Sequence, residues 1–257
     1  MAIHLRQICL VAEHLVPAIR DLSGVFSIRS CYVDPEVGKF GLENTLLPVG
    51  SRFLELVAPT REGTAAGRFL QRRGGAGGYM VICQVPTLED QAAVRARAGD
   101  NGVRVAFEAD RGSWNIMQLH PGDMGASFLE VDWDREADPT GNWEPAGGKG
   151  WKDAVCTDVV SDIVAVELQG ERPGALAERW AAVTGLPLER GDGAARIRLA
   201  NADLRFVPAR DGRGDGLGAL DLRVADRTRL LAEAARRGAR VSDDQVMICG
   251  TRFNLVD

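Results

Sequence analysis

The sequence has 257 residues, of which 45% are hydrophobic and 26% are charged, and its formal net charge is −5. This composition is typical of a globular protein with one large domain or two ordinary ones. The mild acidity excludes general nucleic-acid binding, which needs a concentrated basic face. No apolar run approaches the roughly 20 residues of a membrane helix. Because His4 and Glu13 interrupt the apolar N-terminal stretch, it is not typical of a signal peptide, and we expect a cytoplasmic protein without a membrane partner.

The first predicted elements form a strand, a helix and a hairpin. Leu5–Ala12 predicts a strand, and a helix-compatible stretch follows around Val16–Ser27. Two further strands, Asn44–Val49 and Arg52–Val57, flank Gly50-Ser51. A two-residue turn that begins with glycine is typical of a β-hairpin.

The next segment predicts a strand, a helix and three more strands. Tyr79–Val85 is the first strand, and the helix over Leu88–Asp100 ends at Asn101-Gly102, a plausible C-cap. The remaining strands are Val103–Glu108, Trp114–Leu119 and Ser127–Asp132. Arg135–Trp151 is then rich in glycine and proline, which predicts a domain boundary.

The same order of elements recurs twice after this boundary. Helices are predicted over Gly174–Thr184 and Arg227–Arg237, each preceded by a strand and followed by two or three more. RFNLVD at Arg252–Asp257 also aligns with SFLEVD at Ser127–Asp132. Because one such unit is too small to bury the faces of its own strands, units must pair. We therefore predict an α+β fold of four βαβββ units that form two paired-module half-barrel domains, residues 1–134 and 151–257, joined by a linker at 135–150.

Two glutamates, Glu55 and Glu130, each lie in the middle of an apolar strand, in the similar stretches FLELV and FLEVD. Side chains alternate between the two faces of a strand, so both acids could be ordinary solvent-facing residues. Alternatively, both point into one hollow, where two carboxylates would raise a pKa or bind a cation. The pattern leaves both alternatives open.

The stretches FGLENTLLPVGSRFLELVAP (Phe40–Pro59) and LHPGDMGASFLEV (Leu119–Val131) resemble the vicinal oxygen chelate superfamily. That superfamily contains glyoxalases, extradiol dioxygenases, methylmalonyl-CoA epimerases and bleomycin-resistance proteins, and the first half is most similar to its glyoxalase-like domains. The resemblance implies half-barrels around a cleft, in which a metal is held by two ligands from each unit. Met124 and Ala126 depart from the family's loop, which has Thr and Gly there. Members of the superfamily often pair, so a homodimer is also an expectation.

The resemblance implies a metal set of Gln7, Glu55 and Glu130, with Met80 at the fourth ligand position. Methionine is a poor ligand for the hard cations that carboxylates prefer, so Mg²⁺, Mn²⁺ or Ca²⁺ is expected rather than iron. No equivalent set survives in the second half, where Arg205 corresponds to Glu55, and Leu255 or Asn254 corresponds to Glu130.

Further candidates lie near the proposed cleft. His120 precedes Pro121 and is a candidate acid or base, or else an ordinary loop histidine. On the strand over Trp114–Leu119, either the face with Asn115 or the face with Trp114 lines the cleft. Asn115, Met80 and Trp114 are therefore candidate substrate-binding residues, and His120 and Glu130 are the candidate catalytic residues.

Two functions fit these residues. The first is a metal-dependent isomerase or lyase that acts on a small molecule through an enolate, since the missing histidine ligands argue against dioxygenation. The alternative is a metal-free protein that binds or sequesters a small molecule on the same scaffold. The paired glutamates favour the enzyme, and the missing histidines favour the binding protein.

Overall fold

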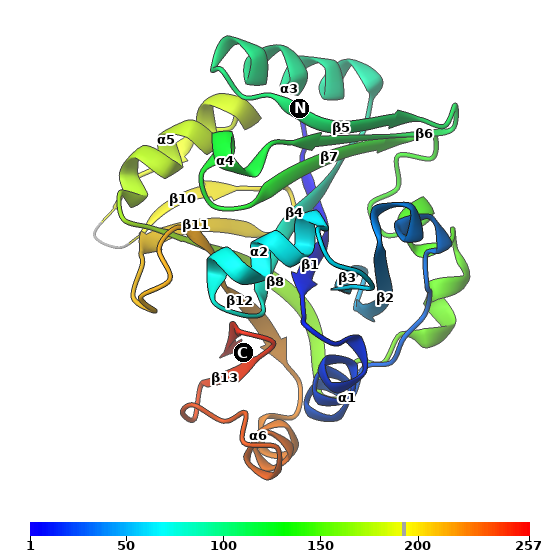
Figure 1. Cartoon of the computed structure of the whole chain (residues 1–257), viewed down its shortest axis with the longest axis vertical. Coiled ribbons are helices and arrows are strands. Elements are labelled where there is room, and N and C mark those ends of the chain that lie inside the picture. The colour runs from blue at the N-terminus through cyan, green and yellow to red at the C-terminus, as the bar shows by residue number, and fades with distance from the viewer. Residues whose placement is uncertain (192–193) are drawn as a thin grey trace. The chain divides into compact units, whose positions relative to one another are not determined.

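The computed structural model describes residues 1–191 and 194–257. Its first half contains two successive repeats of a strand, a helix and antiparallel strands (Figure 1). The first repeat comprises β1 (His4–Val11), α1 (Leu15–Phe26), the 3₁₀ helix η1 (Pro35–Phe40), β2 (Leu42–Val49) and β3 (Arg52–Pro59), followed by α2 (Ala65–Arg73). The second repeat comprises β4 (Gly77–Val85), α3 (Leu88–Asp100), β5 (Val105–Asp110), β6 (Trp114–Leu119), α4 (Pro121–Met124) and β7 (Phe128–Asp134).

The second half repeats this order after two short 3₁₀ helices, η2 (Glu144–Ala146) and η3 (Gly150–Ala154). The third repeat comprises β8 (Val160–Gly170), α5 (Pro173–Thr184), β9 (Leu188–Glu189), β10 (Ala195–Arg198) and β11 (Asp203–Pro208). The fourth comprises β12 (Gly216–Val224), α6 (Arg227–Arg236), β13 (Gln245–Ile248) and β14 (Thr251–Val256). The predicted α+β fold of four repeated units is confirmed, although within the described residues three strands follow the helix only in the second and third repeats, and two follow it in the first and fourth.

The same pairing pattern marks the repeats. The last strand of a repeat lies parallel to its first strand, as β7 does to β4, β11 to β8 and β14 to β12. It also lies antiparallel to the strand before it, as in the hairpins β2–β3, β6–β7, β10–β11 and β13–β14. The last strand is therefore central in each repeat, where its alternate side chains are covered on one face by the repeat's helix.

Local sequence explains where these elements begin and turn. Thr87 accepts a hydrogen bond from the backbone N–H of Asp90 and so caps α3. Gly50 adopts φ 61° in the two-residue turn between Val49 and Arg52, which confirms the predicted hairpin.

The cysteines at Cys9 and Cys83 are buried within strands, as expected of small apolar residues. Cys249, in contrast, is only half-buried. The pairing of Ile248 with Thr251 leaves Cys249 and Gly250 as turn residues, and both take positive φ.

Two compact units form, and each draws on separate segments of the chain. Unit 1 consists of Met1–Gln7, Tyr79–Asn142 and Ala165–Gly218. Unit 2 consists of Ile8–Gly78, Trp143–Val164 and Ala219–Asp257. Unit 1 therefore joins the second and third repeats, and unit 2 joins the first and fourth. This grouping differs from the division into residues 1–134 and 151–257, which stays a prediction.

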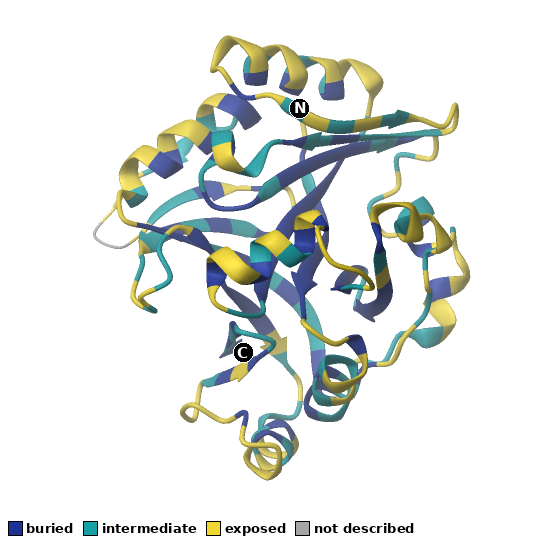
Figure 2. Cartoon of the chain, viewed as in Figure 1, coloured by how far each residue is buried: buried dark blue, intermediate teal, exposed yellow. Residues whose placement is uncertain are grey.

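Helix contacts hold the repeats of unit 1 together. The side chain of Arg97 on α3 donates hydrogen bonds to the carbonyls of Val183 and Thr184 at the end of α5, both at 3.0 Å. The buried Trp180 of α5 donates from Nε1 to the carbonyl of Met124 at 3.2 Å. Because α3 and α5 pack on each other, they cover the same face of the two repeats. Figure 2 shows the buried stripe of α3 on the side toward the strands.

Equivalent contacts join the first and fourth repeats in unit 2. The rings of Phe26 on α1 and Phe253 on β14 meet edge to face, with centroids 4.9 Å apart. The guanidinium of Arg237 pairs with Asp21 at 3.3 Å. In unit 2 an edge-to-face aromatic contact between the repeats is thus accompanied by an ion pair nearer the surface.

Candidate active site

The site in unit 1 lies on the face of β7 opposite its apolar side chains. Leu129 and Val131 are buried, and α3 packs on this strand. Alternation then places Glu130 and Asp132 together on the other face. Both acids are nevertheless buried, with Glu130 4% exposed and Asp132 1% exposed. Two adjacent buried carboxylates are unusual, since burial of a charge is costly unless it is neutralised.

Glu130 is held by its neighbour on β6. The strand register places Gln118 directly opposite Glu130, and the Gln118 amide donates from Nε2 to Glu130 Oε2 at 2.7 Å. On its other side Glu130 lies opposite Ile82 of β4. The amide fixes the orientation of the carboxylate while the apolar neighbour keeps its surroundings dry.

Asp132 differs from Glu130 because neither of its oxygens makes a hydrogen bond of normal geometry to the described residues. Burial raises the pKa of Asp132 well above its usual range, and the negative charge of the neighbouring Glu130 raises it further. Asp132 therefore favours its protonated form beside Glu130. Such a pair can accept a proton at one oxygen and donate one from another.

A buried polar network lies beside this pair. The guanidinium of Arg6, which is 0% exposed, donates to Gln84 Oε1 at 2.7 Å and to the carbonyl of Asp138 at 2.9 Å. Gln84 in turn donates from Nε2 to Asp134 Oδ2 at 2.7 Å. Burial raises the pKa of Asp134, while backbone hydrogen bonds from Ala137 and Glu136 and the charge of Arg6 oppose the rise. The network fixes β1, β4 and β7 of unit 1 around the acids.

Unit 2 contains a related arrangement around Glu55, which is 8% exposed. Asn44 on β2 donates from Nδ2 to Glu55 Oε1 at 2.7 Å. In the fourth repeat, Asn254 donates to Asp221 Oδ1 at 2.7 Å and accepts from Gln245 Nε2 at 2.8 Å. Asn254 therefore sits between its neighbours as Glu130 sits between Ile82 and Gln118. The sequence left Asn254 and Leu255 open as counterparts of Glu130. In the structure Asn254 lies opposite Asp221 and Gln245, and Leu255 lies opposite Leu222.

The predicted metal ligands are divided between the units. Gln7 and Glu130 belong to unit 1, where both are buried, and Glu55 belongs to unit 2. Within residues 1–191 and 194–257, no three or more His, Cys, Asp and Glu side chains are grouped so that they could hold a metal ion. The set of Gln7, Glu55 and Glu130 stays a prediction.

His120 caps the short helix α4 at the end of β6. Its Nδ1 accepts from the backbone N–H of Gly122 at 3.2 Å, so the proton of the neutral ring is on Nε2. Arg104 binds Asp123 through two nitrogens, at 2.8 and 2.9 Å, and these hydrogen bonds hold the pKa of Asp123 well below its usual range. The His120 side chain is 38% exposed, as expected of a histidine at the edge of the sheet.

The candidate substrate-binding residues fall on different faces. The register places Met80 beside Phe128, and Trp114 beside Asp134, so both lie on the face of Glu130. Asn115 lies opposite Trp133 and on the other face, where its amide nitrogen is 2.9 Å from Asp110 Oδ1. Of the two alternatives for β6, the face with Trp114 and Gln118 is the one that carries the acids.

Sequence reasoning placed Gln118 on the face of its strand with Trp114, but it missed Asp132 and the Arg6–Gln84–Asp134 network. One signal was present, since Glu130, Asp132 and Asp134 recur at every second position of one strand. That spacing places all three carboxylates on the same face. The partners of these acids come from other strands and gave no local signal.

The comparisons identify the family. Residues 32–184, more than half of the chain, match the model of the glyoxalase-like domain. The chain therefore belongs to the glyoxalase-like domain family, and the resemblance to the vicinal oxygen chelate superfamily is confirmed. No curated protein matches the chain. Among the described residues, no helix has both the length and the apolar character needed to cross a membrane.

Solved structures are similar over the whole chain or half of it. A hypothetical protein from Staphylococcus aureus has a TM-score of 0.67 at 14% identity and covers 100% of this chain and 99% of its own, which shows the fold. Methylmalonyl-CoA epimerase from Streptomyces coelicolor has a TM-score of 0.45 at 23% identity and covers 52% of this chain and 99% of its own. Methylmalonyl-CoA epimerase from Mycobacterium tuberculosis has a TM-score of 0.43 at 24% identity and covers 51% of this chain and 87% of its own.

Proposed function

We propose that the protein is a small-molecule enzyme of the glyoxalase-like kind, an isomerase or lyase that acts through an enolate. The observation that carries this proposal is the pair of buried carboxyl groups at Glu130 and Asp132. Glu130, oriented by Gln118, would take the proton from the carbon next to a carbonyl group. Asp132, kept protonated by burial, would hold a proton for the enolate oxygen or the returning carbon.

A divalent cation is compatible with these residues. Carboxylate oxygens are the ligands that Mg²⁺, Mn²⁺ and Ca²⁺ prefer, and Mg²⁺ is often held by one or two carboxylates with the remaining positions filled by water or substrate. As an alternative to the proton on Asp132, Glu130 and Asp132 would hold such an ion, because the Asp132 oxygens are not committed to hydrogen bonds of normal geometry and binding would release that proton. When bound, the ion supplies positive charge next to the developing negative charge of the substrate.

Solvent exchange tests the enolate chemistry without knowledge of the natural substrate. Small 2-oxo acids, 2-hydroxy acids and acyl thioesters are incubated with the protein in D₂O, and loss of the proton next to the carbonyl group is followed by NMR. We expect exchange in one of these classes, lost in Glu130→Gln and retained in Glu108→Gln, which changes an exposed acid of the same unit. Absence of exchange in all classes, or equal exchange in Glu130→Gln, would contradict the proposal.

Equilibrium dialysis against Mn²⁺ separates the two proposed ion sites. The ligand set predicted from the resemblance requires weaker binding in both Glu55→Gln and Glu130→Gln. A site built on β7 alone requires weaker binding in Glu130→Gln and Asp132→Asn but not in Glu55→Gln. Unchanged binding in all three variants would remove the ion from the proposed function.

The second candidate function is metal-free binding of a small molecule. It is favoured by the amide side chains that hold the acids, Gln118 on Glu130 and Asn44 on Glu55. These hydrogen bonds satisfy the carboxylates without an ion. A compound that raises the melting temperature of the protein in a concentration-dependent way, without exchange or turnover, would support this alternative.

A further inference from the structure

Four charged residues stand side by side across the third repeat, one on each of four neighbouring strands. The register pairs Glu189 of β9 with Arg196 of β10, Arg196 with Arg205 of β11, and Arg205 with Glu167 of β8. The order across the sheet is acid, arginine, arginine, acid. Like charges directly opposite each other on neighbouring strands cost stability. The two adjacent arginines therefore need a physical explanation.

The acids on either side hold the arginines in place. Arg196 donates from Nη2 to Glu189 Oε2 at 2.9 Å and from Nη1 to Asp203 Oδ2 at 3.2 Å. Arg205 forms an ion pair with Glu167 at 3.5 Å. The side chains of Arg196 and Arg205 remain 36% and 32% exposed, so solvent reaches both. Two guanidinium groups are thus oriented by anchored neighbours while remaining accessible.

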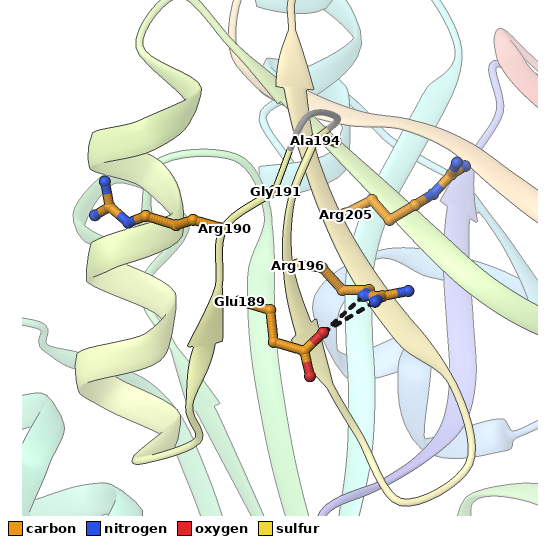
Figure 3. A pocket seen from close by; sticks show the side chains of 6 residues that line it. All are labelled: Glu189, Arg190, Gly191, Ala194, Arg196 and Arg205. Atoms are coloured by element: carbon orange, nitrogen blue, oxygen red, sulfur yellow. Dashed lines mark hydrogen bonds and ion pairs between the residues drawn. The ribbon is translucent and has the colours of Figure 1, made fainter.

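These arginines line a hollow of about 350 Å³ on the third repeat. Its lining residues are Glu189, Arg190, Gly191, Ala194, Arg196 and Arg205. Figure 3 shows Arg196 and Arg205 directed toward the same side of the sheet, whereas Arg190 points away from them. Arg190 pairs instead with Glu178 of α5. The lining carries three arginines and one glutamate, and the neighbouring acids Glu178, Asp203 and Glu167 offset part of this charge. The hollow therefore offers oriented guanidinium groups rather than a net excess of positive charge.

We propose that this hollow is an anion-binding subsite that takes a carboxylate or phosphate group of a small molecule. Guanidinium groups bind such oxyanions through paired N–H donors, and two of them fixed side by side provide both charge and geometry. A bound anion would also remove the repulsion between Arg196 and Arg205.

The place of Arg205 on the last strand of its repeat can be compared with that of Glu130 on the last strand of the second repeat. Arg205 lies on the last strand between Arg196 and Glu167, as Glu130 lies on its own last strand between Gln118 and Ile82. The last strands of the two repeats of unit 1 therefore carry side chains of opposite charge between their neighbouring strands. The proposal goes beyond the proposed function, since it concerns other residues and does not require that Glu130 perform any chemistry.

Calorimetric titration at constant ionic strength tests the subsite with three probes: inorganic phosphate, glycerol phosphate and succinate. We expect saturable binding of at least one probe, weakened about tenfold or more in Arg205→Gln and in Arg196→Gln, since charge-assisted hydrogen bonds are lost. Arg190→Gln is the matched control, because it removes the same charge from the lining but leaves both oriented guanidinium groups; its affinity should change less than about twofold. The affinity of Arg205→Lys should lie between those of wild type and Arg205→Gln, because lysine keeps the positive charge but lacks the paired N–H donors of the guanidinium group.

NMR of the wild-type protein keeps the test decisive if a variant fails to fold. Titration with the same probes should shift the side-chain Nε–H signals of Arg196 and Arg205 with one common affinity, while the signal of Arg190 moves little. Binding that weakens equally in Arg190→Gln would indicate nonspecific charge attraction and overturn the proposal. Absence of saturable binding by all three probes would also overturn it, and neither result would bear on proton exchange at Glu130.

Discussion

Replacement of Arg6 by methionine should destabilise the protein strongly, because its guanidinium is a buried charge with several fixed partners. Arg6→Met keeps a side chain of comparable length but removes the donors to Gln84 Oε1 and to the carbonyl of Asp138. Each buried acceptor left without a donor costs about 1 kcal/mol or more. The loss of the cation near Asp134 adds to this, and breaking a buried charged network typically costs about 3–5 kcal/mol in total.

The pH dependence of this loss provides a second test. Arg6 opposes the rise in the pKa of Asp134, so the pKa of Asp134 should rise further in Arg6→Met. An acid whose pKa is raised by folding stabilises the folded state at low pH, and this contribution disappears as the pH rises through the folded-state pKa. The difference between wild type and Arg6→Met should therefore be larger at about pH 8 than at about pH 4.

Urea unfolding followed by circular dichroism at both pH values measures these differences. Arg104→Met is the control, because Arg104 is 70% exposed and pairs with Asp123 at the surface, where solvent screens an ion pair and its loss changes stability little. If Arg6→Met were no more destabilising than Arg104→Met, the network would not hold the strands as described. A loss that grew toward low pH would refute the account of Asp134.

Three further predictions concern buried groups. Because burial and Glu130 raise the pKa of Asp132, the free energy of unfolding of wild type should fall between about pH 4 and pH 8. In urea unfolding, Asp132→Asn should lose less stability over this range, and an equal dependence of stability on pH in the two proteins would contradict this prediction. Trp180→Phe removes the hydrogen bond to Met124 and should lower the free energy of unfolding by about 1–3 kcal/mol, a loss absent if the indole N–H were solvated. Burial raises the pKa of Cys31 to about 11 and of Cys249 to about 12. Iodoacetamide should therefore alkylate both thiols far more slowly in the folded protein than in urea near pH 8. Mass spectrometry of the two peptides measures these rates, and equal rates in folded and unfolded protein would contradict the prediction.

The repeated fold could be predicted because its signals are local. The helix predicted over Leu88–Asp100 has the same bounds in the structure, where Thr87 and Asn101 occupy its capping positions. The turn at Gly50-Ser51 was also predictable, since glycine at its first position accepts the positive φ that the hairpin requires. These residues report on their own neighbours in sequence, which is the information that periodicity and turn chemistry contain.

The candidate site was predictable only in part. Glu130 could be identified because an acid within an apolar strand departs from the pattern around it. Its relation to Asp132 follows from spacing alone, but the role of Arg6 does not, because an arginine in a first strand shows neither its burial nor its contact with Gln84. Such contacts depend on the pairing of distant strands.

The grouping of the repeats was not predictable from adjacency. Neighbouring units in the chain are usually neighbours in space, yet unit 1 joins the second repeat to the third. The contacts responsible include the hydrogen bond from Trp180 to Met124, and a tryptophan in an amphipathic helix does not reveal which surface covers it. The pairing is encoded in side-chain shape rather than in any repeating pattern.

The interleaved composition of the two units imposes an order on biosynthesis. All the segments of unit 1 have been synthesised once Gly218 is made, but unit 2 still lacks Ala219–Asp257, which includes the partner that covers the first repeat. The first repeat must therefore wait with unburied apolar surface while nearly the whole remaining chain is translated, and its closure brings together segments of very large sequence separation.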